Sequence, residues 1–333
     1  MPAALADDPL VSIAMPVRNN RATLGVAIRS ILAQTHKNWE LLLIDDGSTD
    51  GTPEVARRYA EADGRIRYFR DGQAAGLPDR LNQAVALSRG PLMARMDGDD
   101  VAYPERLARQ SDYLRRHPEV DLVGAWAMVF GPDGRPLGKR IGPEHHEEIC
   151  ARPTAGFPLI HPTYLGKVEF FRSYGYRAAA IRCEDQDLLI RSFARRDSEG
   201  QAGTKERNLR LHDLGGCRFA NVPEILLGYR EESLKLQKLW GTRRHFAASL
   251  FSEFRQRGQT LKAVMAVAEQ AAKAAVDGMA VGTGLNYRLL RHRARPTSDA
   301  ERARWDRLRR ELRLGTDAGD SHDPGIEEYG HAC

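Results

Sequence analysis

Short apolar runs alternate with amphipathic segments along the first third of the chain. Four runs rich in strand-forming residues predict buried β-strands at 10–17, 39–46, 66–69 and 92–96. Segments with apolar residues at helical spacing lie between these runs, and another such segment follows the last run. This alternation is typical of right-handed βαβ units and of a parallel sheet covered by helices on both faces. The pattern therefore predicts an α/β fold.

Carboxylates follow two of these predicted strands. Asp45 and Asp46 end the second strand, and Asp97, Asp99 and Asp100 follow the fourth. The carboxyl ends of parallel strands lie at one edge of a sheet, where open α/β folds bind their ligands. Because side chains alternate along a strand, Asp97 and Asp99 should lie on the same side of the chain. Hard oxygen ligands in this arrangement suit Mg²⁺ or Mn²⁺; an acidic turn that only caps the next helix is the alternative interpretation.

Two common nucleotide-binding motifs are absent from the first half of the chain. No GxGxxG follows the first predicted strand, which disfavours a dinucleotide-binding Rossmann fold, and no GxxxxGK[ST] is present, which disfavours a P-loop nucleotidase. A nucleotide bound by this sheet would therefore be held by carboxylates and a metal ion rather than by a glycine-rich loop.

The bulk composition is that of an ordinary globular protein. The four cysteines among 333 residues are scattered and contain no CxxC pair, which indicates neither a zinc site nor a disulfide framework and favours a reducing cytosol. No uninterrupted apolar run is long enough for a transmembrane helix, and the acidic N-terminus is no secretory signal. A net charge of +5 fits an anionic ligand or surface but does not by itself indicate nucleic acid. We therefore expect a cytoplasmic protein.

The C-terminal third is predicted to be helical and basic. Apolar residues recur at helical spacing from 234 to 276, and arginines are dense from 288 to 313. A basic amphipathic segment can lie on an anionic membrane, so the protein could be peripheral on the inner face of a membrane. A homodimer interface and a helical cover for the catalytic domain are the alternatives. Residues 315–333 are predicted to be a disordered tail.

Several motifs, taken in order, resemble one family of enzymes. They lie at 11–19 (VSIAMPVRN), 30–35, 45–52 (DDGSTDGT), 97–100 (DGDD), 161–163, 184–188 (EDQDL) and 223–230. Their order and spacing resemble those of the family 2 glycosyltransferases, which have the GT-A fold, a Rossmann-like and mostly parallel sheet flanked by helices. The resemblance implies a catalytic domain at 1–232, with a nucleotide-binding half at about 10–120 and an acceptor half at about 121–232, followed by a helical basic extension at 233–314.

The resemblance also implies an activity. It indicates an inverting enzyme that moves a sugar from a nucleotide-diphosphate donor, with a UDP-sugar expected, to a hydroxyl of a saccharide or lipid-linked saccharide, in the synthesis of cell-surface polysaccharide. Residues 197–217 (DSEGQAGTKERNLRLHDLGGC) depart from the family, which usually has a short turn there. This glycine-rich and charged segment is predicted to be either a mobile lid over the acceptor or a surface insertion.

The matching positions carry roles over from the family. The residues that would contact the nucleotide are Pro16, Arg18, Asp46, Arg80 and Asp97. The residues that would hold Mn²⁺ or Mg²⁺ against the diphosphate are Asp99, Asp97 and His161. His161 could instead contact the diphosphate or only pack. A divalent cation is expected because it stabilises the charge of the leaving group.

The acceptor hydroxyl is a poor nucleophile and requires a base, which the resemblance implies to be Asp185, with Glu184 orienting the acceptor. Acidic residues at this position could also only cap a helix. Trp126 and Asp100 are weaker candidates for contacts with the acceptor. Two other functions remain open at this stage: a nucleotidyltransferase with a similar α/β sheet, and a non-catalytic binder of sugar nucleotides or nucleic acid. Binding to nucleic acid is not expected, since Trp305 is the single aromatic residue among the C-terminal arginines.

Overall fold

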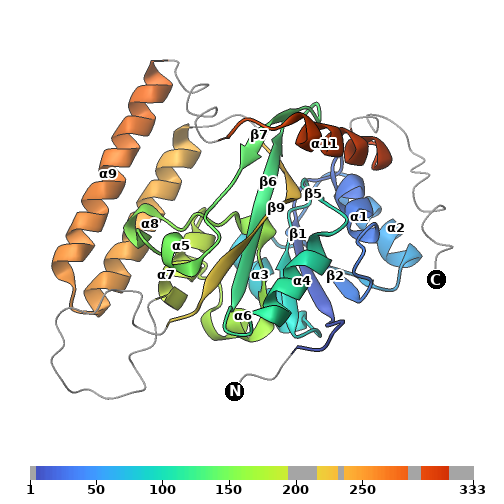
Figure 1. Cartoon of the computed structure of the whole chain (residues 1–333), viewed down its shortest axis with the longest axis horizontal. Helices are drawn as coiled ribbons and strands as arrows, with labels where there is room; N and C mark the ends of the chain where they lie inside the picture. Colours follow the sequence, from blue (N-terminus) through green and yellow to red (C-terminus); the bar gives the residue numbers. More distant parts are fainter. Residues whose placement is uncertain (1–4, 194–215, 232–235, 284–293, 315–333) are drawn as a thin grey trace.

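A computed structural model describes residues 5–193, 216–231, 236–283 and 294–314 of the chain (Figure 1). Its first part contains β1 (Val11–Val17), α1 (Leu24–Leu32), β2 (Trp39–Asp45), α2 (Thr52–Ala62), β3 (Ile66–Arg70), α3 (Leu77–Leu87) and β4 (Leu92–Arg95). The four strands pair in parallel in the order β3-β2-β1-β4, which confirms the predicted alternation. The expected lid at 197–217 lies outside the described residues except for its last two, and so does the tail at 315–333.

The second half extends the same sheet with mixed pairing. It contains β5 (Val101–Ala102), α4 (Arg106–Arg116), β6 (Leu122–Phe130), β7 (Pro136–Arg140), α5 (His146–Ile149), the 3-10 turns η1 (Pro153–Ala155) and η2 (His161–Thr163), β8 (Leu165–Lys167), α6 (Val168–Tyr174), α7 (Glu184–Phe193) and β9 (Phe219–Arg230). The sheet continues from β4 in the order β8-β6-β9-β5, and β7 pairs with β6. β8 runs antiparallel to both β4 and β6, so its N-terminal end lies at the edge where β4 ends.

Both faces of the central strands are covered, which is why their sequences are almost continuously apolar. Alternate residues of β2 belong to different apolar clusters: Leu41 and Leu43 pack with α1, α2 and α4, whereas Leu42 and Ile44 pack with α3, α6 and α7. The period of two along a buried strand therefore supplies two cores, one on each face of the sheet. These cores hold the strand ends, and the loops that follow them, in place.

Two long C-terminal helices, α8 (Leu236–Gln256) and α9 (Thr260–Gly282), lie side by side on the α7 side of the domain (Figure 1). Phe246, Leu250 and Phe254 of α8 join the apolar cluster that contains α7, and α9 packs on the outside of α8. This pair supplies much of the helical extension that the sequence predicted. No helix in the described ranges is long and apolar enough to cross a bilayer.

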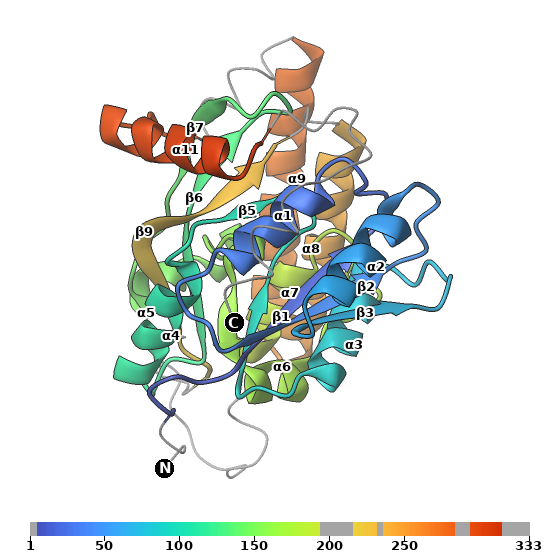
Figure 2. The same cartoon turned by 90° about the vertical axis from the view of Figure 1, so that its right-hand side faces the viewer.

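The last helix, α11 (Asp299–Glu311), covers the opposite end of the sheet, across β7, β6 and β5 (Figure 2). Its Trp305 is fully buried against Phe130, with 4.8 Å between the ring centroids, and the indole donates a hydrogen bond to Gly134 O at 3.0 Å. A Cβ on Gly228 would lie 2.4 Å from the same indole ring, so the contact requires glycine there. The basic run from 302 to 313 is thus largely a helical cover for the sheet, as one of the predicted alternatives proposed.

Candidate active site

Three neighbouring strands place the predicted donor residues along one edge of the sheet. Asp46 directly follows β2, Arg18 directly follows β1, and Asp97 lies two residues beyond the end of β4. In the sheet, β1 lies between β2 and β4. Since neighbouring strands are about 4.8 Å apart, Asp46 and Asp97 are separated by roughly 10 Å along this edge. The loop after β1 contacts both sides, because Asn19 N donates to Ser48 Oγ while Thr23 Oγ1 donates to Gly98 O. The loop after β1 therefore joins the Asp46 and Asp97 parts of the edge.

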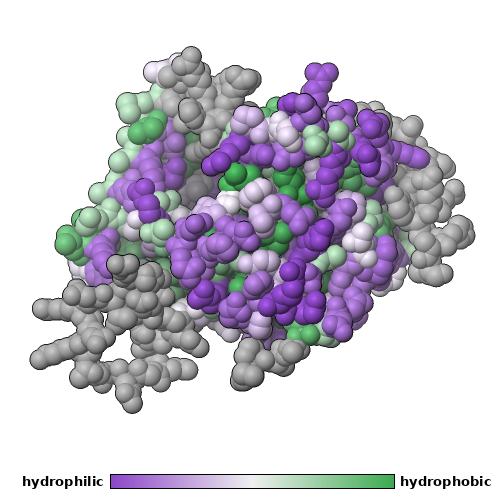
Figure 3. All heavy atoms as spheres, in the orientation of Figure 1, coloured by the Kyte–Doolittle hydropathy of each residue, from purple (hydrophilic) through white to green (hydrophobic). Residues whose placement is uncertain are grey.

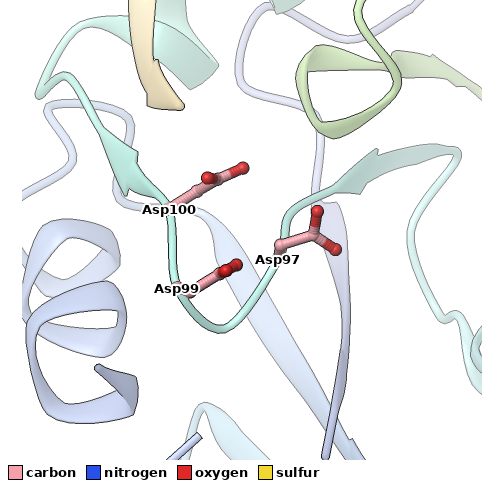
Figure 4. A group of neighbouring side chains, drawn as sticks. All are labelled: Asp97, Asp99 and Asp100. Atoms are coloured by element: carbon pink, nitrogen blue, oxygen red, sulfur yellow. The ribbon is translucent and has the colours of Figure 1, made fainter. Parts of the chain in front are cut away.

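Asp97, Asp99 and Asp100 form a carboxylate group at the end of β4. Their side chains offer oxygens that all lie within 4.8 Å of one another, and the side chains of Asp99 and Asp100 point toward the arm of the turn that carries Asp97 (Figure 4). Gly98 allows this turn to pack beneath β1, because a Cβ there would lie 2.8 Å from Val17 Cγ1. The glycine between Asp97 and Asp99 is therefore required for steric reasons.

Arg230, the last residue of β9, holds the carboxylate group in place. Its backbone N–H donates to Asp100 Oδ1 at 2.9 Å, and its Nε donates to Asp99 O at 3.1 Å. The other oxygen of Asp100, Oδ2, is buried and has no hydrogen-bond partner. A buried acceptor without a donor is costly unless a cation or a proton binds it. Carboxylate oxygens so arranged are what a hard divalent cation requires.

The electrostatics of the group also fit a cation. Burial, and next the charge of Asp97, raise the pKa of Asp99 to about 6. Burial and the charges of Asp97 and Asp99 raise the pKa of Asp100 well above its ordinary value. Carboxylates that repel one another in this way are stabilised in the charged form by a bound cation. Asp100, which the sequence assigned to the acceptor, therefore belongs to the carboxylate group.

Arg95, the last residue of β4, is a site residue that the sequence analysis missed. Its side chain is 4% exposed, and Nη2 lies 2.5 Å from Asp97 Oδ1. Although burial opposes its charge, Asp97 and Asp100 raise the pKa of Arg95 above its ordinary value. Its Nε and Nη1 have no hydrogen-bond partner. Arg95 thus presents a fixed positive charge with unused donors beside the carboxylate group.

The predicted base lies at the N-terminus of α7. Glu184 is buried and Asp185 is half-buried. Burial, and next the charge of Asp185, raise the pKa of Glu184 to about 7, and Asp97 and Arg95 also act on this carboxyl. Burial likewise raises the pKa of Asp185. Both carboxyls are therefore in electrostatic reach of the residues at the end of β4, and both retain a proton to higher pH than an exposed carboxyl.

Gln186 fixes the orientation of Asp185. Its Nε2 donates to Asp185 Oδ2 at 3.2 Å, while its Oε1 accepts a hydrogen bond from Phe157 N at 2.7 Å. Because the amide is held at both ends, one carboxylate oxygen of Asp185 is committed to Gln186.

His161, expected among the metal ligands, lies beside Glu184 instead. Its Nε2 is 3.2 Å from Tyr176 Oη, and its Nδ1 is 3.9 Å from Glu184 Oε1. Burial, and next the charge of Arg95, hold the pKa of His161 well below its ordinary value, so the imidazole is neutral. In the described part of the chain, the group of side chains that could hold a metal ion contains three aspartates and not His161.

At the other end of the edge, Asp46 is held by a network of donors. Its Oδ1 accepts hydrogen bonds from Ala75 N at 2.7 Å, Gly76 N at 2.9 Å and Arg80 Nε at 3.1 Å. The guanidinium of Arg80 also binds Asp71 through both Nη atoms. Arg80 is thus placed to position Asp46. Asp46 Oδ2 lies 3.8 Å from the exposed Arg18.

Two further predicted residues lie within the sheet. Pro16 is buried in β1 and aligns with Ile44 of β2, so it lies inside the sheet and not in the loop that carries Arg18. Trp126 in β6 is half-buried, donates from its indole to Gly142 O at 3.0 Å and packs against the cluster that contains Trp305. Its role toward an acceptor stays a prediction.

The mixed sheet and the carboxylates along one edge define an α/β protein with a candidate cation site, and comparison with known proteins gives the family. The model of the family "Glycosyl transferase family 2" matches residues 12–175. The glycosyltransferase-named protein EpsE of Bacillus subtilis is 38% identical over 230 residues, which cover 68% of this chain and 74% of EpsE. The O-antigen biosynthesis glycosyltransferase WbnJ of Escherichia coli is 27% identical over 233 residues, 69% of this chain and 82% of WbnJ. This chain belongs to glycosyl transferase family 2 and is a glycosyltransferase.

Solved structures share the fold. Residues 1–349 of S. aureus TarS in complex with UDP-GlcNAc match with a TM-score of 0.55 and 13% identity, over 91% of this chain and 80% of that one. The mannosyltransferase PcManGT from Pyrobaculum calidifontis in complex with GDP-Man and Mn²⁺ matches with a TM-score of 0.52 and 15% identity, over 95% of this chain and 92% of that one. The GT-A fold expected from the sequence is thereby confirmed.

Proposed function

We propose that this glycosyltransferase moves a sugar from a nucleoside-diphosphate donor to a hydroxyl of a saccharide or lipid-linked saccharide, with inversion at the anomeric carbon, in polysaccharide synthesis. The observation that carries the proposal is the group of Asp97, Asp99 and Asp100, whose oxygens lie within 4.8 Å at the sheet edge that also carries Asp46. The names of the relatives support it, because WbnJ is an O-antigen biosynthesis enzyme.

Asp99 and Asp100, with Asp97, would hold Mn²⁺ or Mg²⁺. When bound, the cation would neutralise charge on the leaving diphosphate, an effect worth several kcal/mol in enzymes that use it. Arg95 adds a fixed, buried positive charge beside Asp97, which suits a site for an anionic diphosphate. The N-terminal residues would bind the nucleoside, with Asp46 Oδ2 and Arg18 at its rim.

Residues of α7 would deprotonate and orient the acceptor. As the acceptor oxygen bonds to the anomeric carbon and the bond to the diphosphate breaks, the carboxylate of Asp185 would take the hydroxyl proton. Glu184 precedes this base in α7, and the neutral His161 lies 3.9 Å from Glu184; the two residues would orient the acceptor. Attack from the face opposite the diphosphate inverts the configuration in one displacement, so a second carboxylate nucleophile is not required.

A cleft next to the base suits the acceptor. It has a volume of about 270 Å³ and is lined by Phe157, Gln186, Arg243, Phe246 and Gln270, among others. The side chain of Gln186 lines the cleft and also contacts Asp185. Aromatic faces together with amide and guanidinium groups are the surfaces to which a sugar binds through its apolar face and its hydroxyls. We therefore assign this cleft, between α7 and the α8–α9 pair, to the acceptor.

The donor nucleotide is proposed to be a UDP-sugar, with a GDP-sugar as the main competitor, because the matching structures contain UDP-GlcNAc and GDP-Man. A thermal-shift panel of nucleotide sugars with Mn²⁺ would identify the donor, since a ligand that binds the native state stabilises it by mass action. The selected donor would then be used to measure release of the nucleoside diphosphate by the full-length protein.

The decisive variants are Asp99→Asn and Asp185→Asn. We expect Asp99→Asn to lose the Mn²⁺-dependent release of nucleoside diphosphate, and Asp185→Asn to retain donor binding but to lose transfer by about 10² to 10⁴-fold. Asp133→Asn, on an exposed turn, is the matched control and should behave like the wild type. Undiminished transfer in Asp185→Asn would remove the base assignment. Formation of pyrophosphate from a nucleoside triphosphate and a sugar phosphate would replace the proposal with a nucleotidyltransferase.

A further inference from the structure

The outer face of α9 is apolar along its length and is covered by nothing in the described part of the chain. Large apolar side chains are exposed on it, including Met265 (62%) and Met279 (63%). Together with three exposed alanines on the same side they form what we call the α9 ridge: Leu261, Val264, Met265, Ala268, Ala272, Ala275, Val276 and Met279. Figure 3 shows it as green and pale-green spheres on the outer, left-hand edge of the molecule. At 1.5 Å per residue the ridge is about 27 Å long.

The spacing of the ridge shows that it is one face of the helix and not a scatter of residues. Its members recur at intervals of three and four, the spacing of neighbours on one side of an α-helix. The opposite side of α9 faces α8 and the catalytic domain, where Ala263 and Ala266 are fully buried and Gln270 donates to Thr154 O at 2.6 Å. α9 is therefore already packed on one side, and the ridge is a second apolar face. Exposed apolar surface of this extent marks an interaction site.

The charges beside the ridge indicate what binds it. With 100° between successive residues, Lys262 and Lys273 project roughly 100–120° from the centre of the ridge, on the same side. The acidic residues of α9 are both neutralised: Glu269 lies 3.0 Å from Lys273 and 3.4 Å from Arg152, and Asp277 is buried 3.2 Å from Arg243. On this side of the ridge three cations, Lys262, Lys273 and Arg152, stand against one carboxylate, Glu269, so this border carries a net positive charge.

We propose that the α9 ridge binds the surface of an anionic membrane, with its apolar side chains in the acyl boundary and Lys262, Lys273 and Arg152 at the headgroups. An apolar helix face bordered by cations is the surface that lies in the interface of an anionic bilayer. A second copy of this chain fits less well, since it would bring an equally positive border against this one. No described helix is long and apolar enough to span the bilayer, so α9 lies along the membrane.

This placement has a consequence for the acceptor. The inner sides of the same two helices contribute Arg243, Phe246 and Gln270 to the cleft beside Gln186. The α8–α9 pair would therefore separate a membrane on the outer side of α9 from the proposed acceptor cleft. That position suits a lipid-linked saccharide, whose lipid remains in the bilayer while its sugar reaches the cleft. The membrane proposal itself rests on the ridge and its charges and not on the identity of the acceptor.

The test is flotation of the full-length protein with phosphatidylcholine vesicles that contain or lack phosphatidylglycerol. We expect the wild type to float with the anionic vesicles and to float much less with the neutral ones. The Met265→Glu/Val276→Glu variant should lose binding by more than tenfold, because it places two carboxylates in the ridge without changing a buried residue. Lys262→Ala should weaken binding to anionic vesicles roughly fivefold and leave neutral vesicles unaffected.

Leu137→Glu is the matched control, because Leu137 on β7 is also exposed (60%) but lies on another element, and it should float like the wild type. Nucleotide-sugar thermal shifts should be the same in all these variants, so a failure of the donor assignment would not be mistaken for a failure of this proposal. The proposal is overturned if the wild type ignores anionic vesicles or if the ridge variant floats equally well. It is also overturned if light scattering shows a dimer that the ridge variant dissociates.

Discussion

The environment of Glu184 makes a quantitative prediction about folding. Its pKa is about 7 in the folded protein, against an ordinary value near 4.5, mainly because burial opposes its charge and next because Asp185 lies beside it. Below pH 4.5 the carboxyl is protonated in both the folded and the unfolded chain, so its environment has no effect. Above pH 7 it is ionised in both, and the folded state is destabilised by the full difference in pKa.

The size of this effect follows from the shift. At 1.36 kcal/mol for each pKa unit, the ionised Glu184 destabilises the folded state by about 3 kcal/mol above pH 7. Glutamine has a similar shape and cannot ionise. Glu184→Gln should therefore gain stability relative to the wild type as the pH rises from about 4.5 to 7, and most of the ~3 kcal/mol should be present at pH 8.

The assay is urea unfolding of both proteins at pH 5 and pH 8, with EDTA and without nucleotide, because a bound ligand would add its own stabilisation. Glu301→Gln is a control of opposite sign, since the hydrogen bonds from Lys139 and Ser298 outweigh burial and hold the pKa of Glu301 below its ordinary value. That variant should lose stability relative to the wild type as the pH rises. A difference between Glu184→Gln and the wild type that is equal at the two pH values, or smaller at pH 8, would refute the reasoning.

Three further predictions concern the carboxylate turn, α11 and the base. Gly98→Ala should weaken Mn²⁺ binding at least tenfold, because its Cβ would meet Val17 Cγ1 at 2.8 Å and displace the turn; calorimetric titration measures this. Trp305→Ala should lower the free energy of unfolding by about 3–5 kcal/mol in urea titrations, because it empties a fully buried site under α11. The acidic limb of kcat/KM against pH should lie above the range of an exposed aspartate, because burial raises the pKa of Asp185 and only the ionised carboxylate can act as base.

The N-terminal half of the fold could be predicted because each of its elements is determined locally. Buried strands that are apolar on both faces and helices with one apolar face can be recognised in a short window of sequence. The pairing of β6 with β9 could not, because these strands are far apart along the chain and meet in parallel with register shifts on both sides of Trp126. The role of α11 could be predicted only as one of several alternatives, since its many arginines conceal the single Trp305 that anchors it.

The residues of the site likewise divide into those that the sequence predicts and those that it does not. Asp46, Asp97 and Asp99 follow strands, so topology alone places them at one edge. Arg95 escaped notice because a single arginine in an apolar strand gives no sign that it pairs with Asp97 beyond the strand end.

The contacts of Arg230 and His161 could not have been predicted from the sequence either. Arg230 reaches Asp99 and Asp100 from β9, 130 residues away from Asp100 in sequence. His161 could be assigned to Glu184 only once β8 was known to run antiparallel to β4.

The most direct test of the central claim is the binding of Mn²⁺ itself, measured by the loss of its free electron paramagnetic resonance signal on titration with the protein. The wild type should bind Mn²⁺, and UDP or GDP should tighten this binding, because the diphosphate would share the cation with the carboxylate group. Asp99→Asn should lose most of the binding, whereas Asp133→Asn should keep it. Equal binding of Mn²⁺ by Asp99→Asn and the wild type, with no response to either nucleotide, would contradict a cation site at this edge of the sheet.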